Sequence, residues 1–599
     1  MDGSNAFART LTRRPYKGSR RKIVLAMDIG TTFSGVSYSI LDPGQQPIVK
    51  AVTRFPAQTH IGDAKIPSIA YYDQSGAIQA IGAEALEENI LESAAENEWY
   101  KAEWFKLHLR DANNDSQSSS FDFNSDIPAL PPNRTVIDIF ADFLRYLHSC
   151  TKEYIKESHP NGEEIWDNAN ITNDIDYVLS HPNGWEGKEQ TEMRKAAVEA
   201  DLIPDTNDGH KRLSFVTEGE ASLHFAVECG VLAENTEGVI IVDAGGGTVD
   251  ISTYGKKMEG GRNIFSESAT PECHFHGSVF VTMAAGKMME EYLKDSPYVD
   301  DIEHIMQCFD RTTKLQFKSI ESAQYVKFGS NRDMDVKYNI RFGQLKLEGW
   351  MIATCFEPSI DCIVKVVKEH QRTATTRISH VVLVGGFAAS NWLFDQVKAM
   401  LSSTGLKVLR PENRTNKAVS DGAISYYLDH HVRARMARYS YGDFICVLYD
   451  ETDDGHLDRS TRLVTWQDGT KRIPDYFDVM IKKGTSVSET QEFPINFYRI
   501  FKKGDHVNRT LNSTIWCYKG NHEDPQWRDI DPGGFVRLCT LQANLSDLPM
   551  KRKWTLRGSF YRVEYSVIIH FGLTEMKAQL QWLKSGRLYR TPAKIVYDP

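Results

Sequence analysis

The sequence predicts a two-lobed α/β domain that is followed by a smaller, β-rich domain. Three observations lead to this prediction. Strands alternate with helices through most of the chain, an acidic turn near the N-terminus has a near-copy later, and short β-rich runs replace the alternation after about Tyr441. Strand–helix alternation is typical of α/β folds, and an internal copy indicates two similar lobes around a cleft.

The composition argues against several classes of function. The chain has 599 residues, 41% of them hydrophobic and 25% charged, with a formal net charge of −10. Nucleic-acid and membrane-surface proteins normally present a basic face, so neither class is expected. No run approaches the roughly 18 apolar residues of a membrane span. Nine cysteines without CxxC spacing, and no secretory signal, indicate a cytoplasmic protein, with the nucleus as the alternative.

The first 22 residues read as a disordered tail. Its charged residues are Arg13, Arg14, Lys17, Arg20, Arg21 and Lys22. Nuclear import or an anionic surface would be the functional reading of this basic cluster, and a solvated N-terminus is the simpler one.

The first lobe is predicted over about 23–235. Its opening stretch, 23–108, alternates strands with turn signals and ends in the helical stretch "AEWFKLHL". Residues 110–133 are polar and Pro-rich, which predicts a surface loop, and a helix is expected from Thr135. The strand "DYVLSHPNGW", a helix around Ala197 and the strand "LSFVTEGEA" complete the lobe.

The second lobe is predicted over about 236–430 and repeats the pattern. It contains the near-copy "VIIVDAGGGTVDISTY" and a further buried strand, "HVVLVGGFAAS". A basic linker is expected at 431–442. From 443 to 599, short β-rich runs separated by Gly, Pro, Asp and Asn predict an antiparallel β domain, and no helical lid is expected after it.

The two acidic turns superimpose along the sequence. Asp28 of "IVLAMDIGTTFSGVSYSI" falls on Asp243, and Gly30 falls on Gly245. Each segment is a strand, an Asp, a small turn and a second strand, which predicts a β-hairpin with a carboxylate at its bend. One such turn alone is more often a tight turn than a site. Two matching hairpins make a binding site the better interpretation.

The chemistry of such bends favours a phosphate chain. Glycines let consecutive N–H groups approach an anion, and Thr31, Thr32 and Thr248 add hydroxyl donors. Asp28 and Asp243 would repel phosphates unless a cation intervened, and Mg²⁺ held through its water shell suits that role. The Walker A pattern is absent, which disfavours a P-loop fold.

One other motif could ligate a metal. The segment "ECHFHG" contains Cys273, His274 and His276. Because no second ligand pair stands at a standard spacing, a metal site there is disfavoured.

Three segments together resemble the actin-like ATPase superfamily, and within it the heat shock protein 70 chaperones. "MDIGTTFSGV" is similar to the first phosphate motif of that family, "IVDAGGGTVDIS" to the second, and "VVLVGGFAAS" to the adenosine motif. The resemblance covers about 23–430 and is thinner beyond Tyr441. It implies duplicated ribonuclease H-like lobes, ATP or ADP as ligand, Mg²⁺ as cofactor, and peptide clients and cochaperones as partners.

The resemblance also implies roles for single residues. Lys106 matches a lysine near the γ-phosphate, Glu218 an acidic residue near the attacking water, and Asp250 a further acidic position. Asp28 and Asp243 would hold Mg²⁺. The residues implied in nucleotide binding are Gly30, Thr31, Thr32, Phe33, Gly245, Gly246, Gly247, Thr248, Asp310, Lys314, Gly385, Gly386 and Phe387. Without the resemblance, Lys106 and Glu218 would read as ordinary surface charges.

Several departures from the family pattern are visible. The family's Glu-Pro pair reads Glu218-Gly219, although Pro182 is retained. Phe387, Ala388 and Ala389 replace polar residues of the adenosine motif. The acidic, leucine-rich linker is missing. This combination resembles the atypical, lid-less branch of the family, the twelve-A type.

Three functions remain open from the sequence. The first is slow, Mg-dependent ATP hydrolysis coupled to peptide or protein binding, as in a chaperone. The second is a nucleotide-gated interaction module with little or no hydrolysis, which the altered linker favours. The third is a small-molecule kinase of the same fold, for which no catalytic carboxylate can be assigned.

Overall fold

The computed structural model forms two compact units. The first consists of Met1–Trp185 with Glu192–Val432, and the second of Glu186–Thr191 with Arg433–Pro599. The residues described are 13–58, 64–109, 127–171, 173–185, 187–232, 236–259, 262–412, 415–488, 491–502, 510–555, 558–571 and 575–595. Most of the predicted tail and of the predicted loop at 110–133 therefore lies outside the described residues.

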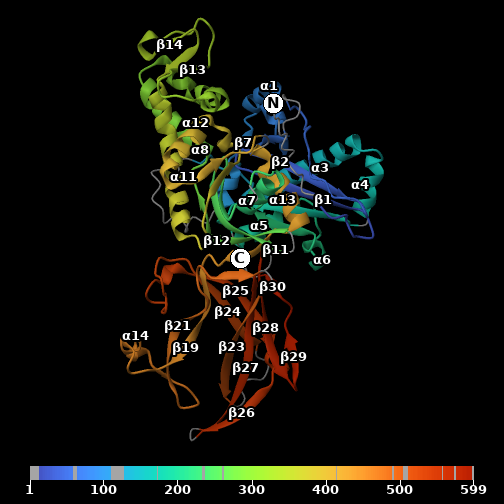
Figure 1. Cartoon of the computed structure of the whole chain (residues 1–599), viewed down its shortest axis with the longest axis vertical. Helices are drawn as coiled ribbons and strands as arrows, with labels where there is room; N and C mark the ends of the chain where they lie inside the picture. The colour runs from blue at the N-terminus through green and yellow to red at the C-terminus, as the bar shows by residue number, and fades with distance from the viewer. Residues whose placement is uncertain are drawn as a thin grey trace, which may run out of the picture. The chain divides into compact units, whose positions relative to one another are not determined.

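The first lobe of the first unit is built on a mixed sheet with the strand order β3-β2-β1-β8-β9, and β4 pairs with β2. Figure 1 labels β1 and β2 of this sheet. The strands are β1 (Lys22–Ile29), β2 (Phe33–Leu41), β3 (Lys50–Ala51), β4 (Lys65–Pro67), β8 (Ile175–His181) and β9 (Leu213–Thr217). β1 and β2 form an antiparallel hairpin in which Asp28 lies opposite Gly35, and β8 runs parallel to β1. The hairpin predicted around the first acidic turn is therefore present.

Helices cover this sheet. The helix expected from Thr135 is α3 (Val136–Ser158), and Thr135 caps it in a reciprocal pair of hydrogen bonds with Asp138. Its buried face, with Phe140, Phe143 and Leu144, packs in one core with strand residues of β1. The remaining elements are α1 (Glu88–Glu96), α4 (Gly162–Ile171), α5 (Lys188–Glu199), α6 (Asn207–His210) and the small sheet of β5 (Ile69–Tyr72), β6 (Ile78–Ile81) and β7 (Tyr100–Glu103).

Two sequence predictions in this lobe need correction. The stretch "AEWFKLHL" is not one helix, because β7 ends at Glu103 and a 3-10 turn, η2, spans Phe105–Leu109. The strand predicted as "LSFVTEGEA" stops at Thr217, whose side chain accepts a hydrogen bond from the N–H of Glu220 and caps α7 (Glu218–Glu228). Threonine is a favoured N-cap residue, so the strand gives way to a helix there.

The second lobe repeats the design with the strand order β17-β16-β10-β11-β12. The strands are β10 (Gly238–Ala244), β11 (Val249–Glu259), β12 (Arg262–His274), β16 (His380–Val384) and β17 (Lys407–Leu409). β10 and β11 form the second hairpin, in which Asp243 lies opposite Asp250, and β16 runs parallel to β10. The core on this sheet includes residues of α8 (Ser278–Leu293), α11 (Gly349–Thr373) and α12 (Asn391–Met400).

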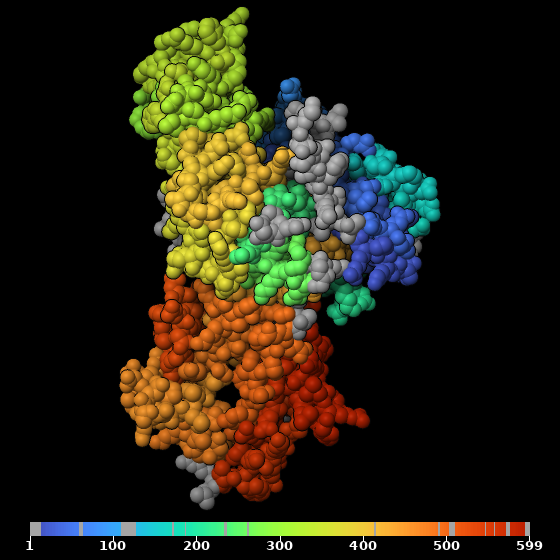
Figure 2. All heavy atoms as spheres, in the orientation of Figure 1, coloured from blue at the N-terminus to red at the C-terminus, as the bar shows by residue number. Residues whose placement is uncertain are grey.

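A small subdomain extends the second lobe. It contains α9 (Ile302–Cys308), a π-helical turn η5 (Phe309–Thr313), α10 (Lys314–Gln316) and a sheet of β13 (Gln324–Lys327), β15 (Gln344–Leu347) and β14 (Ile340–Arg341). Figure 2 shows this lime-coloured part as a knob on the surface of the first unit.

Two helices hold the lobes together. α7 packs on β10 of the second lobe, and α13 (Ala418–Asp429) packs on β1 and β2 of the first. The helices meet backbone to backbone, since a Cβ on Gly422 would lie 1.8 Å from the carbonyl oxygen of Ala221. Arg13 adds a clamp, because its guanidinium donates to Glu228 at 3.2 Å and to Asp429 at 2.9 Å.

The second unit is built from two antiparallel sheets. One has the order β20-β21-β19-β24-β25, and the other has the order β23-β27-β28-β29, with β26 on β27 and β30 on β28. The strands of these sheets are β19 (Ser440–Leu448), β20 (Val464–Thr465), β21 (Lys471–Ile481), β23 (Glu492–Lys502), β24 (Thr510–Tyr518), β25 (Phe535–Asn544), β26 (Met550–Thr555), β27 (Gly558–Phe571), β28 (Met576–Lys584), β29 (Arg587–Arg590) and β30 (Lys594–Ile595). Two further strands, β18 (Val432–Met436) and β22 (Ser486–Ser488), pair with each other, and one short helix is α14 (Asp454–Leu457). Ile515, Leu541, Val567 and Leu580 bring both sheets into one core.

The predicted fold class, a two-lobed α/β domain followed by a β-rich region, is confirmed. The boundaries of the predicted domains and linker stay a prediction. Within the described ranges, every helix is too short or too polar to serve as a transmembrane segment.

Candidate functional site

The bend of the first hairpin is held by a buried carboxylate and a glycine. Asp28 is 3% exposed and accepts from Lys65 Nζ at 2.7 Å and from Ser180 Oγ at 2.9 Å. A Cβ on Gly30 would lie 2.4 Å from the carbonyl oxygen of Phe33, so the bend requires glycine there. The carbonyl of Gly30 is itself held by a hydrogen bond from the Ser68 hydroxyl at 2.7 Å.

The bend of the second hairpin is held from behind by the start of α8. The N–H groups of Gly277, Ser278 and Val279 donate to the carbonyls of residues 247, 245 and 246 at 3.3, 3.1 and 2.9 Å. Because the N–H and C=O of a trans peptide point in opposite directions, the N–H groups of residues 246–248 face away from α8. Successive N–H groups that face one way form an anion-binding concavity.

The two bends lie against each other. A Cβ on Gly246 would lie 2.3 Å from Thr32 Oγ1, and a Cβ on Gly247 would lie 2.4 Å from Thr31 Oγ1. The hairpins of the two lobes therefore converge, with hydroxyl donors on one side and backbone N–H donors on the other.

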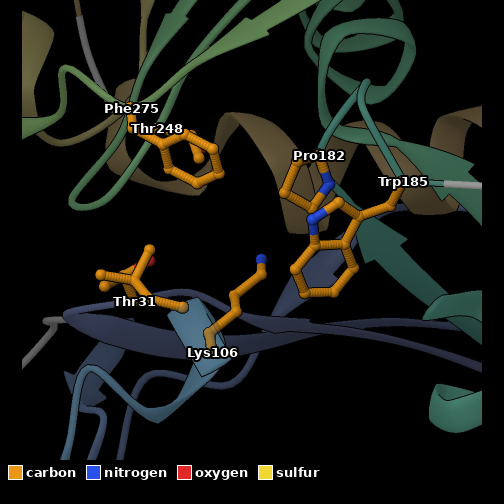
Figure 3. A pocket seen from close by; sticks show the side chains of 7 residues that line it. Thr31, Lys106, Pro182, Trp185, Thr248 and Phe275 are labelled. Carbon is orange, nitrogen blue, oxygen red and sulfur yellow. The ribbon is translucent and has the colours of Figure 1, made fainter. Parts of the chain in front are cut away.

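Lys106 enters the space beside the two bends. It lies on η2, is 4% exposed and donates to Glu218 Oε1 at 2.6 Å. Its Nζ lies 5.5 Å from the centre of the Trp185 ring. A small pocket surrounds it, and Figure 3 shows the Lys106 side chain reaching between Thr31 and Trp185. The pocket is lined by Thr31, Lys106, Leu107, Pro182, Trp185, Thr248 and Phe275.

The site holds more buried carboxyl groups than lysines, and this crowding appears in their pKa values. Burial alone would raise the pKa of Asp28, but Lys65 and Lys106 outweigh it and lower the pKa. Burial and the neighbouring Glu218 raise the pKa of Asp243 to about 8 and that of Asp250 to about 7. Deprotonation of Asp243 is thus opposed by its surroundings.

This crowding of carboxyl groups tests whether the residues suit a divalent cation. A bound cation inverts the cost of crowded carboxylates, and Mg²⁺ uses one or two carboxylates while keeping several waters. Asp28 and Asp243 provide such a pair. In the described part of the chain, no group of three or more His, Cys, Asp or Glu side chains could hold a metal ion by itself, and a water-mediated Mg²⁺ does not need one.

Asn183 connects the lobes next to this pocket. Its backbone N–H donates to Asp250 Oδ1 at 2.6 Å, and its side-chain amide donates to Ser252 Oγ at 3.0 Å and to the carbonyl of Glu272 at 3.1 Å. Its amide oxygen accepts from the N–H of Gly219 at 3.3 Å. This single residue, in the turn that follows β8, thus bonds to α7, β11 and β12.

The third predicted segment also reaches the site. A Cβ on Gly385, where φ is +90°, would lie 2.4 Å from Asp243 Oδ1, so this strand end touches the acidic bend. A Cβ on Gly386 would meet nothing within 4 Å, which leaves open space over that residue. Phe387 instead packs on Phe356 in the core of the second lobe.

Three other predicted residues lie apart from the pocket lining. Asp310 and Lys314 form an ion pair with each other, and both bond to the hydroxyl of Thr282 on α8. Phe33 starts β2 and is 51% exposed. The roles of all the predicted site residues in nucleotide binding stay predictions.

The sequence analysis missed several residues that the structure brings to the site. Lys65, Ser180 and Ser222 bond to the two acidic residues, Ser222 donating to Asp243 Oδ2 at 2.6 Å. Trp185 and Phe275 line the pocket. Trp185 ends the strand-stop "HPNGW", so its place after a buried strand was a usable signal. Lys65, Ser180, Ser222 and Phe275 lie in no local sequence pattern that predicts a site.

Comparison with known proteins gives distant relatives along nearly the whole chain. The human heat shock 70 kDa protein 12A is 23% identical over 651 residues, which cover 93% of this chain and 89% of that protein. The mouse heat shock 70 kDa protein 12A is 22% identical, and the alignment again covers 93% of this chain and 89% of that protein. The human heat shock 70 kDa protein 12B is 22% identical over 670 residues, covering 96% and 91%. No protein-family profile matches the chain.

These relatives agree with the resemblance read from the motifs. The chain is similar to the atypical twelve-type branch of the heat shock 70 kDa proteins over more than its first unit, and the predicted resemblance is confirmed. It is a protein of the actin-like ATPase fold.

Proposed function

We propose, from this similarity and from the converging hairpins, that the protein binds ATP with Mg²⁺, hydrolyses it slowly, and uses the nucleotide to control the binding of peptides or proteins by its β-rich unit. The observation that carries the proposal is the contact of Thr31 and Thr32 with the glycine turn at 245–247, since it joins two sets of phosphate donors beside a buried lysine.

The polar groups in and around the pocket each have a part in the proposed reaction. Bound Mg²⁺ would supply positive charge to the phosphate oxygens, with Asp28 and Asp243 as its holders. Lys106 adds a second positive charge next to the transferred phosphoryl group. Glu218 and Asp250 orient the attacking water, and Thr248 hydrogen-bonds phosphate. Phosphoryl transfer depends on such positioning and charge more than on covalent chemistry.

The β-rich unit offers edges for an extended peptide. β29 pairs only with β28 among the described strands, and its Leu588 and Tyr589 are 56% and 44% exposed. An extended peptide can add to such an edge by backbone hydrogen bonds. None of the cysteines, all of which lie in the described residues, forms a disulfide, which supports a reducing compartment such as the cytoplasm.

The test is calorimetry of ATP and ADP binding, with and without Mg²⁺. Asp28→Asn is expected to reduce the Mg²⁺-dependent part of the affinity about tenfold or more, because one carboxylate of the proposed pair becomes neutral. Asp300→Asn, an exposed position, is the matched control. If the wild-type protein binds neither nucleotide, the proposal fails.

Single-turnover phosphate release separates hydrolysis from simple gating. Release that is faster than in buffer, and slower in Glu218→Gln, supports an ATPase. Tight ATP binding without release supports the alternative, a nucleotide-gated interaction module. Binding of a fluorescent extended peptide that is the same with ATP, with ADP and without nucleotide would refute the proposed coupling.

A further inference from the structure

The last strands of the β-rich unit carry a charge opposite to that of the whole chain. Between Met550 and Ile595 the sequence has ten lysines and arginines but only two acidic residues, Glu564 and Glu575, whereas the formal net charge of the chain is −10. A concentration of positive charge on one part of a protein attracts negatively charged partners. This part of the unit therefore favours negative charge in whatever binds to it.

Three of these positive charges stand in a row on an edge strand, β26. They are Lys551, Arg552 and Lys553, and all three side chains are exposed. β26 pairs with β27 at residues 558–563, β28 pairs with β27 at 566–571, and β23 pairs with β27 along nearly its whole length. β26 and β28 therefore share one side of β27, and Figure 1 shows β26 at one end of the sheet.

The outer edge of β26 is open for pairing. Among the strands formed by the described residues, β26 pairs only with β27. An edge strand of this kind presents a row of N–H and C=O groups that point away from its own sheet. An extended peptide can bind to such a row by backbone hydrogen bonds.

The side chains of β26 alternate between the two faces of the sheet. Lys551 and Lys553 share one face, and Arg552 and Trp554 share the other. An extended partner beside this edge would therefore have positive charge next to the side chains on both of its own faces.

Trp554 adds an apolar anchor to this edge. Its side chain is 69% exposed, and the guanidinium of Arg552 lies 4.1 Å from the centre of the indole ring. Arg552 is itself held in place, because its Nη2 donates to Ser559 Oγ at 3.3 Å. A cation over an aromatic face is attracted to it, so the indole is ordered before a partner binds. Tryptophans are enriched among the residues that contribute most to protein interfaces.

The positive charge of β26 is only partly neutralised. Glu564 Oε2 accepts from Lys551 Nζ at 2.7 Å, and Glu564 Oε1 lies 3.1 Å from Arg562 Nε. Arg552 and Lys553 form no ion pair with the side chains that the structure describes. These two residues are therefore available to a carboxylate of a partner.

The charges determine which strands can pair with β26. Lysines on an edge strand normally prevent pairing with other chains. Like charges directly opposite each other destabilise a strand pair, and opposite charges stabilise it. A second copy of this chain would bring its own basic strand to β26, so self-pairing is disfavoured. A strand that carries aspartate or glutamate has the complementary charge.

We propose that the outer edge of β26 binds an extended acidic peptide, which adds to the sheet as a further strand. Its carboxylates lie beside Arg552 and Lys553, and its apolar side chains contact Trp554. The inference rests on the proposed function, in which the β-rich unit binds peptides, and it adds the charge of the peptide and the edge that takes it. On β29, by contrast, Arg590 already forms two hydrogen bonds with Glu492.

Fluorescence anisotropy of labelled peptides tests this site on the full chain without nucleotide. One peptide of about eight residues alternates glutamate with threonine, and its partner has lysine in place of glutamate. The acidic peptide is expected to bind about tenfold or more tightly than the lysine peptide, and its affinity should fall as salt is added, because salt screens exposed charges. Absence of binding by the acidic peptide, or equal affinities for the two peptides, overturns the proposal.

A charge reversal on β26 locates the site. Arg552→Glu with Lys553→Glu is expected to weaken the acidic peptide about tenfold or more and to strengthen the lysine peptide. Failure to fold cannot produce such an exchange of preference. Lys482→Glu with Lys483→Glu changes the net charge equally at two exposed positions of the same unit, and it should alter neither affinity. Equal effects of the two double variants would show general charge attraction and overturn the β26 site.

Other anionic partners are separate outcomes of the same assay. Phosphatidylserine vesicles and a single-stranded oligonucleotide carry negative charge but no strand backbone. Binding of either one without binding of the acidic peptide overturns the proposal.

Nucleotide separates this inference from the proposed function. Acidic-peptide affinities that are equal with ATP, with ADP and without nucleotide would refute the proposed coupling and still support the β26 site. ATP binding without any binding of the acidic peptide would overturn the β26 site and leave the proposed nucleotide site standing.

Discussion

Replacing Asp243 with asparagine is expected to remove a pH-dependent loss of stability from the first unit. Burial and the nearby Glu218 raise the pKa of Asp243 from 3.8 to about 8. Between these two pH values the folded protein holds a proton that the unfolded chain has lost. The free energy of unfolding therefore falls as the pH rises through this window, by up to about 1.4 kcal/mol per pH unit.

The size of the effect follows from the same two values. From pH 6 to pH 8 the loss adds up to about 2 kcal/mol for one carboxyl with a pKa of about 8. Asparagine cannot ionise, and its amide oxygen still accepts the hydrogen bond from Ser222. The variant should therefore gain about 2 kcal/mol over the wild-type protein between pH 6 and pH 8. For a unit of this size that corresponds to roughly 2–3 °C in Tm.

Differential scanning calorimetry at pH 6, 7 and 8, in EDTA and without nucleotide, measures this difference. Asp300→Asn, an exposed carboxyl, controls for the change in net charge. The gap between Asp243→Asn and the wild-type protein should widen with pH, while the gap for Asp300→Asn stays constant. An equal gap for Asp243→Asn at pH 6 and pH 8 would show that the carboxyl is already ionised and would refute the reasoning.

Three further predictions use other sites. Gly386→Ala should leave Tm unchanged, because the new Cβ meets nothing within 4 Å, but it should lower ATP affinity about tenfold in calorimetry by filling the space proposed for adenosine. The control Gly533→Ala, whose Cβ also meets nothing within 4 Å, should change neither Tm nor ATP affinity. Unaltered ATP affinity in Gly386→Ala would exclude adenosine from that space. Lys106→Ala should retain ATP binding but slow single-turnover phosphate release by about 10²–10³-fold, unlike the control Lys211→Ala at an exposed position. An unchanged rate in Lys106→Ala removes Lys106 from the mechanism. Arg13→Ala should lower stability by about 1–3 kcal/mol, seen as a lower Tm, because it leaves two carboxylates without their cation, and an unchanged Tm would mean that this clamp contributes nothing.

The two hairpins could be predicted from the sequence because their signal is local. Each is an apolar strand that stops at an acidic residue and a glycine, and the second copy made chance an unlikely explanation for the first. The structure pairs Asp28 with Gly35 and Asp243 with Asp250. The parallel pairing of β16 with β10 then brings Gly385 to the same edge.

The partners of these carboxylates could not be predicted in the same way. Lys65 comes from an edge strand and Ser180 from the end of β8, and only the folded sheet brings them to Asp28. Neither follows a period or a motif. For Asp310 and Lys314 a local pattern was present but had a second explanation. Their spacing also suits an ion pair within one helical segment, and that pair is what forms.

Asn183 determines how the cleft can open. Its hydrogen bonds to Asp250, Ser252, Glu272 and Gly219 hold three elements on one residue. Neutral hydrogen bonds contribute about 0.5–1.5 kcal/mol each and a bond to a carboxylate about 1.5–3 kcal/mol, so releasing all four at once is costly. A rotation of the two lobes that keeps these four hydrogen bonds intact turns about Asn183. The parts of the lobes that lie farthest from Asn183 then move furthest.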